Sequence, residues 1–390
     1  MIDVSRARAM TPGCADRAHL NNAGAALMTQ GILETTVAHL ELESRIGGYE
    51  AARTANDRFE AVYTSTAALI GASPGEIAIV DNATAAWHLA FESVPLKDGD
   101  VILTAEAEYA TNYIMYLKTA RERGVEIRVI PSDETGQLDV AALKDAVDER
   151  TGLISVSHVP TNGGLINPAA EIGAVARDAG VPFLLDACQS VGQLAVDVAD
   201  IGCDFMTATG RKFLRAPRGT GFLYVRSEML RDLEPPLIDM HGADWVEPDR
   251  YELRPTARRY ETWEFNHAAV LGLGAAVDEA LGWGIADIED RVIRLGYLLR
   301  NRLVEAGFET YDIGHRLCAI VTTRVPGVEA PEVMDRLFEQ GINVSVTPPS
   351  STLIDARRRD LPDLIRLSPH YYNTEDELDG AVDALTTLRP

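Results

Sequence analysis

Residues 207–225 of the chain read Thr-Ala-Thr-Gly-Arg-Lys-Phe-Leu-Arg-Ala-Pro-Arg-Gly-Thr-Gly-Phe-Leu-Tyr-Val. Lys212 lies between a short run with hydroxyl side chains and a glycine-rich turn, which leads into the apolar segment 221–225. Glycines allow a backbone to approach a ligand closely, so this pattern suits a lysine packed beside a buried group. We therefore interpret Lys212 as a candidate for imine chemistry.

A second signal lies upstream, where Asp186 ends the apolar run 181–185. The pattern predicts a buried strand with the carboxylate at its carboxyl end, the edge at which open α/β sheets bind ligands. Pyridoxal phosphate requires a lysine, an acid beside its ring nitrogen and donors for its phosphate. Lys212 and Asp186 would supply the first two, Thr209 and Arg211 would contact the phosphate, and Gln189 would donate to the ring's phenolic oxygen.

Each residue alone has a plainer interpretation, because a loop lysine is commonly solvated and an aspartate after a strand commonly caps a helix. Together and in this order they resemble the class V family of pyridoxal phosphate enzymes, which includes cysteine desulfurases, isopenicillin N epimerases, kynureninases and several C–S lyases. The resemblance covers most of the chain. It implies a fold-type I enzyme, with a mostly parallel large domain and a smaller α+β domain.

The resemblance also implies further cofactor contacts. Ala83 and Thr84 match the phosphate loop, since they open a helix after the expected strand 76–80. Tyr109 matches the ring-stacking position, where desulfurases carry histidine, and Thr161 is a further expected contact. The alternative for Tyr109 is a side chain packed on a helix.

On the substrate side, Arg366 matches the arginine that grips an α-carboxylate as a fork. Gly24 and Tyr49 lie in segments similar to substrate loops of the branch that includes the ergothioneine-pathway C–S lyase, and the run from Arg366 to His370 is similar as well. His370 is either a substrate contact or a packed polar side chain.

The family builds its site at a two-fold dimer interface, which implies a homodimer here. Trp263, Glu264 and Asn266 are then the expected contacts from the partner subunit. The alternative is that they cap the following helix and fill the interface.

The expected reaction depends on the cysteines. A persulfide-forming desulfurase needs a thiolate on the loop before the arginine strand, and residues 341–366 contain no cysteine. Cys188 is nearest to the site in sequence but is expected to point into the core. We therefore expect β-elimination on a cysteine-derived thioether or sulfoxide, with Lys212 removing the Cα proton.

Two rivals remain open. An epimerase or aminotransferase would use the same lysine without a leaving group. A nucleotide-binding or regulatory α/β protein is disfavoured because no G-x-G-x-x-G follows the first strand.

Composition limits the partners and the setting. The net charge of −23 and pI of about 4.7 disfavour nucleic acid and anionic membranes. The four cysteines have no C-x-x-C spacing, so a reduced cytoplasm is the expected setting, and no metal site is expected. No segment approaches the roughly 18 apolar residues of a membrane span.

Hydrophobic periodicity predicts the domain organisation. Helical patterns precede and separate apolar strands, which predicts an α/β fold with helices on both faces of the sheet; the strands are expected at 76–80, 101–104, 125–130, 152–157 and 181–185. We expect a large cofactor-binding domain over 16–278 and a small domain over 279–390 together with 1–15. Residues 348–360 are expected to form a mobile loop over the site.

Overall fold

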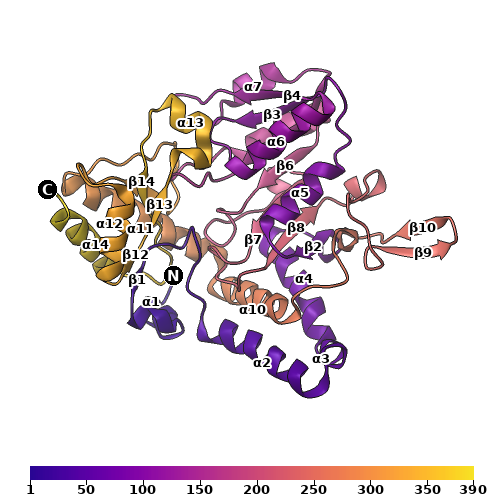
Figure 1. Cartoon of the computed structure of the whole chain (residues 1–390), viewed down its shortest axis with the longest axis horizontal. Helices are drawn as coiled ribbons and strands as arrows, with labels where there is room; N and C mark the ends of the chain where they lie inside the picture. Colours follow the sequence, from indigo (N-terminus) through magenta and orange to yellow (C-terminus); the bar gives the residue numbers. More distant parts are fainter.

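The computed structural model describes all 390 residues, arranged as a large unit built on one sheet and a smaller unit beside it (Figure 1). The large sheet has seven strands in the order β2-β8-β7-β6-β5-β3-β4. Only β8 runs against its neighbours, so the sheet is mostly parallel as predicted. Its strands are β2 (Ile77–Val80), β3 (Val101–Ala105), β4 (Glu126–Ile130), β5 (Thr151–Ser157), β6 (Phe183–Asp186), β7 (Phe205–Thr209) and β8 (Gly221–Val225).

Helices cover both faces of this sheet because successive strand side chains point to opposite sides. Leu103, for example, joins the core under α4, α8 and α10, whereas Ile102 joins the core under α5 and α6. The helices of the large unit are α2 (Gln30–Ile46), α3 (Gly48–Thr54), α4 (Asn56–Ile70), α5 (Ala83–Ser93), α6 (Ala110–Arg123), α7 (Val140–Ala146), α8 (Ala169–Ala179), α9 (Val198–Ile201) and α10 (His267–Trp283).

The smaller unit has its own core and its own antiparallel sheet, in the order β11-β14-β13. A parallel pair, β1 with β12, attaches the N-terminal segment to it. Both chain termini lie at this unit (Figure 1). Its elements are α1 (Val4–Ala9), β1 (Ala18–His19), α11 (Ile285–Glu305), β11 (Val321–Thr323), α12 (Ala330–Glu339), β12 (Ile342–Asn343), β13 (Ser345–Thr347), α13 (Leu353–Arg358), β14 (Leu364–Leu367) and α14 (Glu375–Thr387).

Packing adjusts the expected boundaries. A division at 278/279 falls inside α10, which packs along its length on α2 and α4. The segment 348–360, expected to be a mobile loop, instead forms a short 3-10 helix followed by α13. The ion pair between Arg358 and Glu106, with 3.1 Å between Nε and Oε2, ties α13 to the loop after β3.

Two further features lie at the periphery. The hairpin of β9 (Ala243–Glu247) and β10 (Arg250–Leu253) projects from the large unit, and α2 with α3 forms an arm below it (Figure 1).

No single helix has the length and apolar composition of a membrane span. The pair α10 and α11 has them only when the two helices are counted together, and an 82° bend separates the two.

The close contact between α8 and α9 yields a stability prediction. A Cβ at Gly173 of α8 would lie 1.8 Å from the carbonyl oxygen of Ile201, whereas one at Gly380 of α14 would meet no atom within 4 Å. We expect Gly173→Ala to lower the free energy of unfolding by about 1 to 3 kcal/mol through overpacking. Gly380→Ala should raise it by up to about 1 kcal/mol through helix propensity. Urea denaturation of both variants checks this, and equal stability of the two would contradict it.

Candidate functional site

The carboxyl ends of the parallel strands meet at one edge of the large sheet and surround a cavity of about 220 Å³. Asp186 ends β6, Thr209 ends β7 and Ser157 ends β5. The cavity brings together all nine residues expected around the cofactor: Ala83, Thr84, Tyr109, Thr161, Asp186, Gln189, Thr209, Arg211 and Lys212. Asn82, Ser157, Val159 and Cys188 complete its lining.

Lys212 enters this cavity from the turn after β7, where the Arg215 backbone N–H donates to the Lys212 carbonyl (2.9 Å). Its amine makes no ion pair with a carboxylate. Burial lowers the pKa of the Lys212 ammonium below its ordinary value; Arg211 and Arg366 lower it further, while Asp186 opposes them. The amine is therefore more readily neutral than a surface lysine, as a nucleophile and base must be.

At the floor of the cavity, Asp186 belongs to a buried carboxylate network. Asn112 Nδ2 donates to Asp186 Oδ2 (3.0 Å) and to Glu108 Oε1 (2.9 Å), and the Cys188 backbone N–H donates to Asp186 Oδ1 (2.9 Å). Glu108 also accepts from the Ser157 hydroxyl (2.5 Å) and backbone N–H (2.9 Å). Burial, reinforced by the charge of Asp186, raises the pKa of Glu108 to about 7.

Sequence reasoning missed Glu108, Asn112 and Ser157. The sequence shows that Glu108 stands next to Tyr109, but it does not show that the Glu108 side chain points toward Asp186. Asn112 is the third residue of α6 and carries no motif of its own. Only the packing of α6 against β5 and β6 shows that these side chains meet under Asp186.

The opposite wall is the N-terminus of α5, which begins at Ala83 with Asn82 as its N-cap. The first amides of a helix have no partner within the helix, so they can bind a phosphate. Gly221 allows this approach, because a Cβ there would lie 2.9 Å from the Asn82 carbonyl carbon. These donors, the free lysine and the carboxylate floor fit pyridoxal phosphate.

Cations line the substrate side without acidic partners. Arg366 is 8% exposed, and its Nη1 donates to the hydroxyl (2.7 Å) and carbonyl (3.1 Å) of Thr161, whereas its Nε has no partner. Burial, with Arg211 nearby, lowers the pKa of Arg366 to about 10. Arg211 donates to the carbonyl of Gly24, which places the Gly24 loop beside these arginines. An uncompensated buried guanidinium favours an anionic ligand.

His370 is a packed side chain rather than a substrate contact. It is fully buried, with Nε2 bonded to the Phe213 carbonyl (2.8 Å) and Nδ1 accepting from the Tyr371 backbone N–H (2.8 Å). Burial lowers its pKa to about 3, so it is neutral. The expectation that His370 touches substrate is therefore wrong, because both ring nitrogens are already bonded within the fold.

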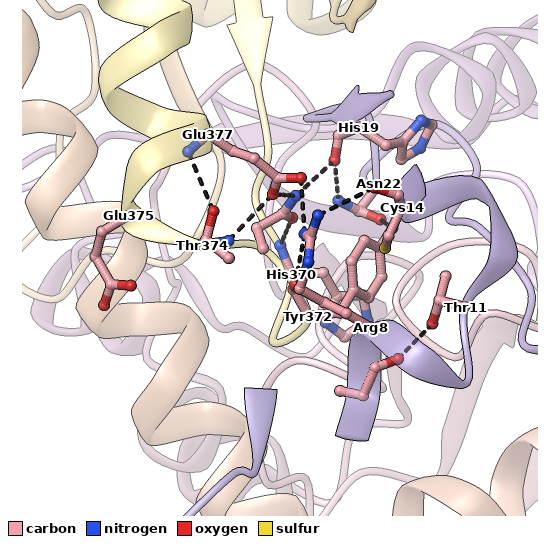
Figure 2. A network of polar contacts seen from close by, with 12 residues as sticks. Arg8, Thr11, Cys14, His19, Asn22, His370, Tyr372, Thr374, Glu375 and Glu377 are labelled. Atoms are coloured by element: carbon pink, nitrogen blue, oxygen red, sulfur yellow. Dashed lines mark hydrogen bonds and ion pairs between the residues drawn. The ribbon is translucent and has the colours of Figure 1, made fainter. Parts of the chain in front are cut away.

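Figure 2 shows His370 within a polar network that joins the two ends of the chain. Arg8 of α1 donates to Glu377 of α14 (2.7 Å), and Glu377 in turn accepts from Asn373 (2.8 Å). Asn22 donates to the carbonyls of His19 (3.1 Å) and Ser368 (2.7 Å). This network fixes the loop before Gly24 against the segment after Arg366.

The remaining expected residues lie away from the cavity within one chain. Tyr49 is on α3 with its side chain 76% exposed. Trp263 and Glu264 are exposed before α10, and Asn266 caps that helix by accepting from the Ala269 backbone N–H (2.9 Å). The structure thus supports the capping interpretation for Asn266. Contacts of Tyr49, Trp263 and Glu264 with a partner subunit stay predictions.

Comparisons with known proteins place this geometry in context. The family model "Aminotransferase class-V" matches residues 18–380. A probable cysteine desulfurase of Methanothermobacter thermautotrophicus is 30% identical over 337 residues, covering 85% of this chain and 84% of that protein. The apo cysteine desulfurase of Thermococcus onnurineus NA1 superposes with a TM-score of 0.93 at 25% identity, covering 100% and 98% of the two chains. The cystine C–S lyase C-DES, solved with its product cysteine persulfide, shares the fold with a TM-score of 0.88 at 22% identity, covering 97% and 100%.

The free amine in the cavity predicts where the cofactor attaches. Borohydride reduction of protein loaded with pyridoxal phosphate should label the peptide that contains Lys212. Lys212→Ala should lose the label and the visible absorbance band, whereas Lys118→Ala, an exposed residue on α6, should keep both. Mass spectrometry of the digests checks this, and a label elsewhere would disprove the assignment.

Because Arg366 has no acidic partner, we expect its replacement to impair substrate binding without lowering the stability of the fold. Arg366→Met should keep or raise the melting temperature, because it removes a buried charge with no acidic partner. It should also lower kcat/KM at least thirtyfold, taking about 2 kcal/mol or more for loss of a buried charge contact. Calorimetry and steady-state kinetics check both effects.

Arg300→Met is the matched control, because Arg300 is a buried arginine paired with Asp312 (2.7 Å). It should cost about 3 to 5 kcal/mol of stability by leaving that carboxylate buried alone. Equal destabilisation by Arg366→Met and Arg300→Met would contradict the expected difference between an arginine without an acidic partner and a paired one.

Proposed function

Because the chain belongs to the class V aminotransferase family and its cofactor is pyridoxal phosphate, we propose that it is a C–S lyase. Its substrate would be a cysteine-derived thioether or sulfoxide, of the kind cleaved in the ergothioneine-pathway branch of the family. The observation that carries this proposal is that Arg366 is buried without an acidic partner near Lys212, whose pKa is lowered by burial, in a chain with no cysteine at 341–366.

Arg366 would bind the substrate carboxylate as a two-pronged donor, since no acidic side chain competes for it. Thr161 holds the guanidinium from behind, and the Gly24 loop closes the neighbouring side through Arg211. Held there, the substrate carboxylate would lie near Lys212, because Arg366 and Lys212 are neighbours. Binding geometry of this kind supplies much of an enzyme's rate acceleration.

Lys212 Nζ would take the Cα proton, because burial keeps the amine readily neutral. The cofactor, when bound, would supply the sink for the electron pair left at Cα, and Asp186 would be the acid that keeps its ring nitrogen protonated. The Cβ–S bond then breaks, and sulfur leaves with that electron pair as a thiolate or sulfenate that takes up a proton. Water replaces nitrogen in the remaining fragment, so that pyruvate and ammonia are the other products.

The cysteines support a lyase over a persulfide-forming desulfurase. Cys203 and Cys318 are buried in the cores, and Cys14 lies near α1. Cys188 lines the cavity, but burial and the charge of Asp186 raise the pKa of its thiol well above the ordinary range. A protonated thiol is a poor nucleophile toward sulfur.

An epimerase or aminotransferase is the alternative, since both would use Lys212 and Arg366 without breaking a bond at Cβ. These reactions share both residues with the lyase, so the products distinguish them. We also propose a cytoplasmic homodimer, in which Trp245 of the β9–β10 hairpin and Trp263, both exposed in the single chain, would be covered by the partner.

Product analysis tests the proposal. Loaded protein incubated with S-alkyl cysteines and their sulfoxides should release pyruvate and a sulfur product in equal amounts, and Cys188→Ala should retain this activity. Loss of activity in Cys188→Ala, with persulfide formed on the wild-type protein from cysteine, would establish a desulfurase instead. Racemised substrate or a new amino acid without pyruvate would establish the alternative.

A further inference from the structure

We propose that Glu108, acting through Asn112, is a positioning residue for Asp186, and that it sets how strongly Asp186 holds the protonated ring nitrogen of the cofactor. The inference rests on the cofactor site alone. It does not depend on which substrate the enzyme cleaves.

The geometry of Asn112 carries this proposal. Its amide nitrogen donates to both carboxylates, at 2.9 Å to Glu108 and 3.0 Å to Asp186, so one –NH₂ group links two acids from different elements. All three side chains are buried. An amide that uses both protons in this way cannot rotate without breaking a buried hydrogen bond, which fixes the orientation of the Asp186 carboxylate.

Glu108 is itself held from several sides. Ser157 donates twice, the Tyr109 backbone N–H donates to Oε1 (2.7 Å) and the Thr104 hydroxyl donates to Oε2 (3.3 Å). This number of donors suits an ionised carboxylate, and none of them is a cation. Glu108 therefore has no counter-ion among its hydrogen-bond donors. Above its pKa of about 7, its negative charge lies beside Asp186, joined to it through the shared amide of Asn112.

The electrostatic consequence has a definite sign. Two titratable side chains interact with Glu108 electrostatically. Burial, and with it the charge of Asp186 from β6, raises the pKa of Glu108, and Tyr116 from α6 is neutral because burial raises the pKa of its hydroxyl. A negative charge beside Asp186 makes that carboxylate a stronger partner for a cation. Glu108 thus favours the protonated ring, which is the better electron sink.

Nitrogen-15 NMR of protein loaded with ring-labelled pyridoxal phosphate measures this effect directly. In Glu108→Gln we expect the ring-nitrogen shift to move toward that of a neutral pyridine, because the variant keeps the side-chain shape and removes the charge. The dissociation constant of the cofactor should rise about tenfold, corresponding to one pKa unit of coupling. With substrate, kcat should fall while KM stays near that of the wild type.

Glu106→Gln is the matched control. Glu106 lies two residues earlier on the same loop, accepts hydrogen bonds from Ser132 and pairs with Arg358, away from Asp186. Its ring-nitrogen shift should equal that of the wild type. A Glu108→Gln protein that loses stability but keeps the wild-type ring shift and cofactor affinity would show that Glu108 is only structural and overturn the proposal.

The route through Asn112 is tested by a double-mutant cycle. If Asn112 transmits the effect, Glu108→Gln should change the ring shift much less in an Asn112→Ala background than in the wild type. Additive effects would overturn the role of Asn112. Should Glu108→Gln fail to fold, Ser157→Ala is the second variant, because it removes a hydroxyl donor that favours the ionised form of Glu108. It should move the ring-nitrogen shift in the same direction as expected for Glu108→Gln, by a smaller amount. An unchanged shift would count against the proposal.

The ring-nitrogen shift and the cofactor dissociation constant are measured without turnover of a thioether, and only the kcat comparison needs a substrate. A protein that binds the cofactor but releases no pyruvate would refute the proposed reaction and leave the Glu108 test intact. An altered ring shift in Glu108→Gln would, in turn, establish the positioning role for any reaction of this site.

Discussion

The arrangement around Lys212 depends on the hydrogen bonds made by the buried guanidinium of Arg215. It lies three residues after the lysine, in a backbone conformation with φ of 65°, and is bonded to Thr11, the Leu27 carbonyl and Tyr371. Burying a guanidinium is costly unless hydrogen bonds compensate it, and the partners of Arg215 come from the N-terminal segment and the C-terminal segment, which therefore meet the lysine turn at this point. The two units are thereby joined around the reactive amine.

Burial of charge also divides the cavity into two sides. Carboxylates lie at the floor, where Asp186 and Glu108 share the amide of Asn112, and arginines without acidic partners lie at the substrate side. A zwitterionic cofactor with a cationic ring nitrogen, and a substrate with a carboxylate, match these two sides. Burial is the main reason that the pKa of Lys212 is lowered, and the arginines nearby lower it further.

Much of the fold could be predicted because local patterns were strong. The apolar runs before Asp186 and after the lysine turn became β6 and β8, since buried strands require little more than such runs and flanking turns. The nine expected cofactor residues line one cavity because parallel strands end at one edge. Residues 348–360 were predicted poorly, because their proline and serine content suggested a loop while contacts with Glu106 stabilise a helix.

By itself, the sequence determined which residue types stand at the ends of successive elements: a lysine, an acid and donors for a phosphate. Residue type and local periodicity are enough to predict this. Tertiary structure decided what each side chain faces. The side chain of His370 is buried in the core, with both ring nitrogens hydrogen-bonded. Arg366 has no acidic partner, and Glu108 lies beside Asp186 because both accept from Asn112. These outcomes depend on contacts between residues far apart in the chain, which no local pattern encodes.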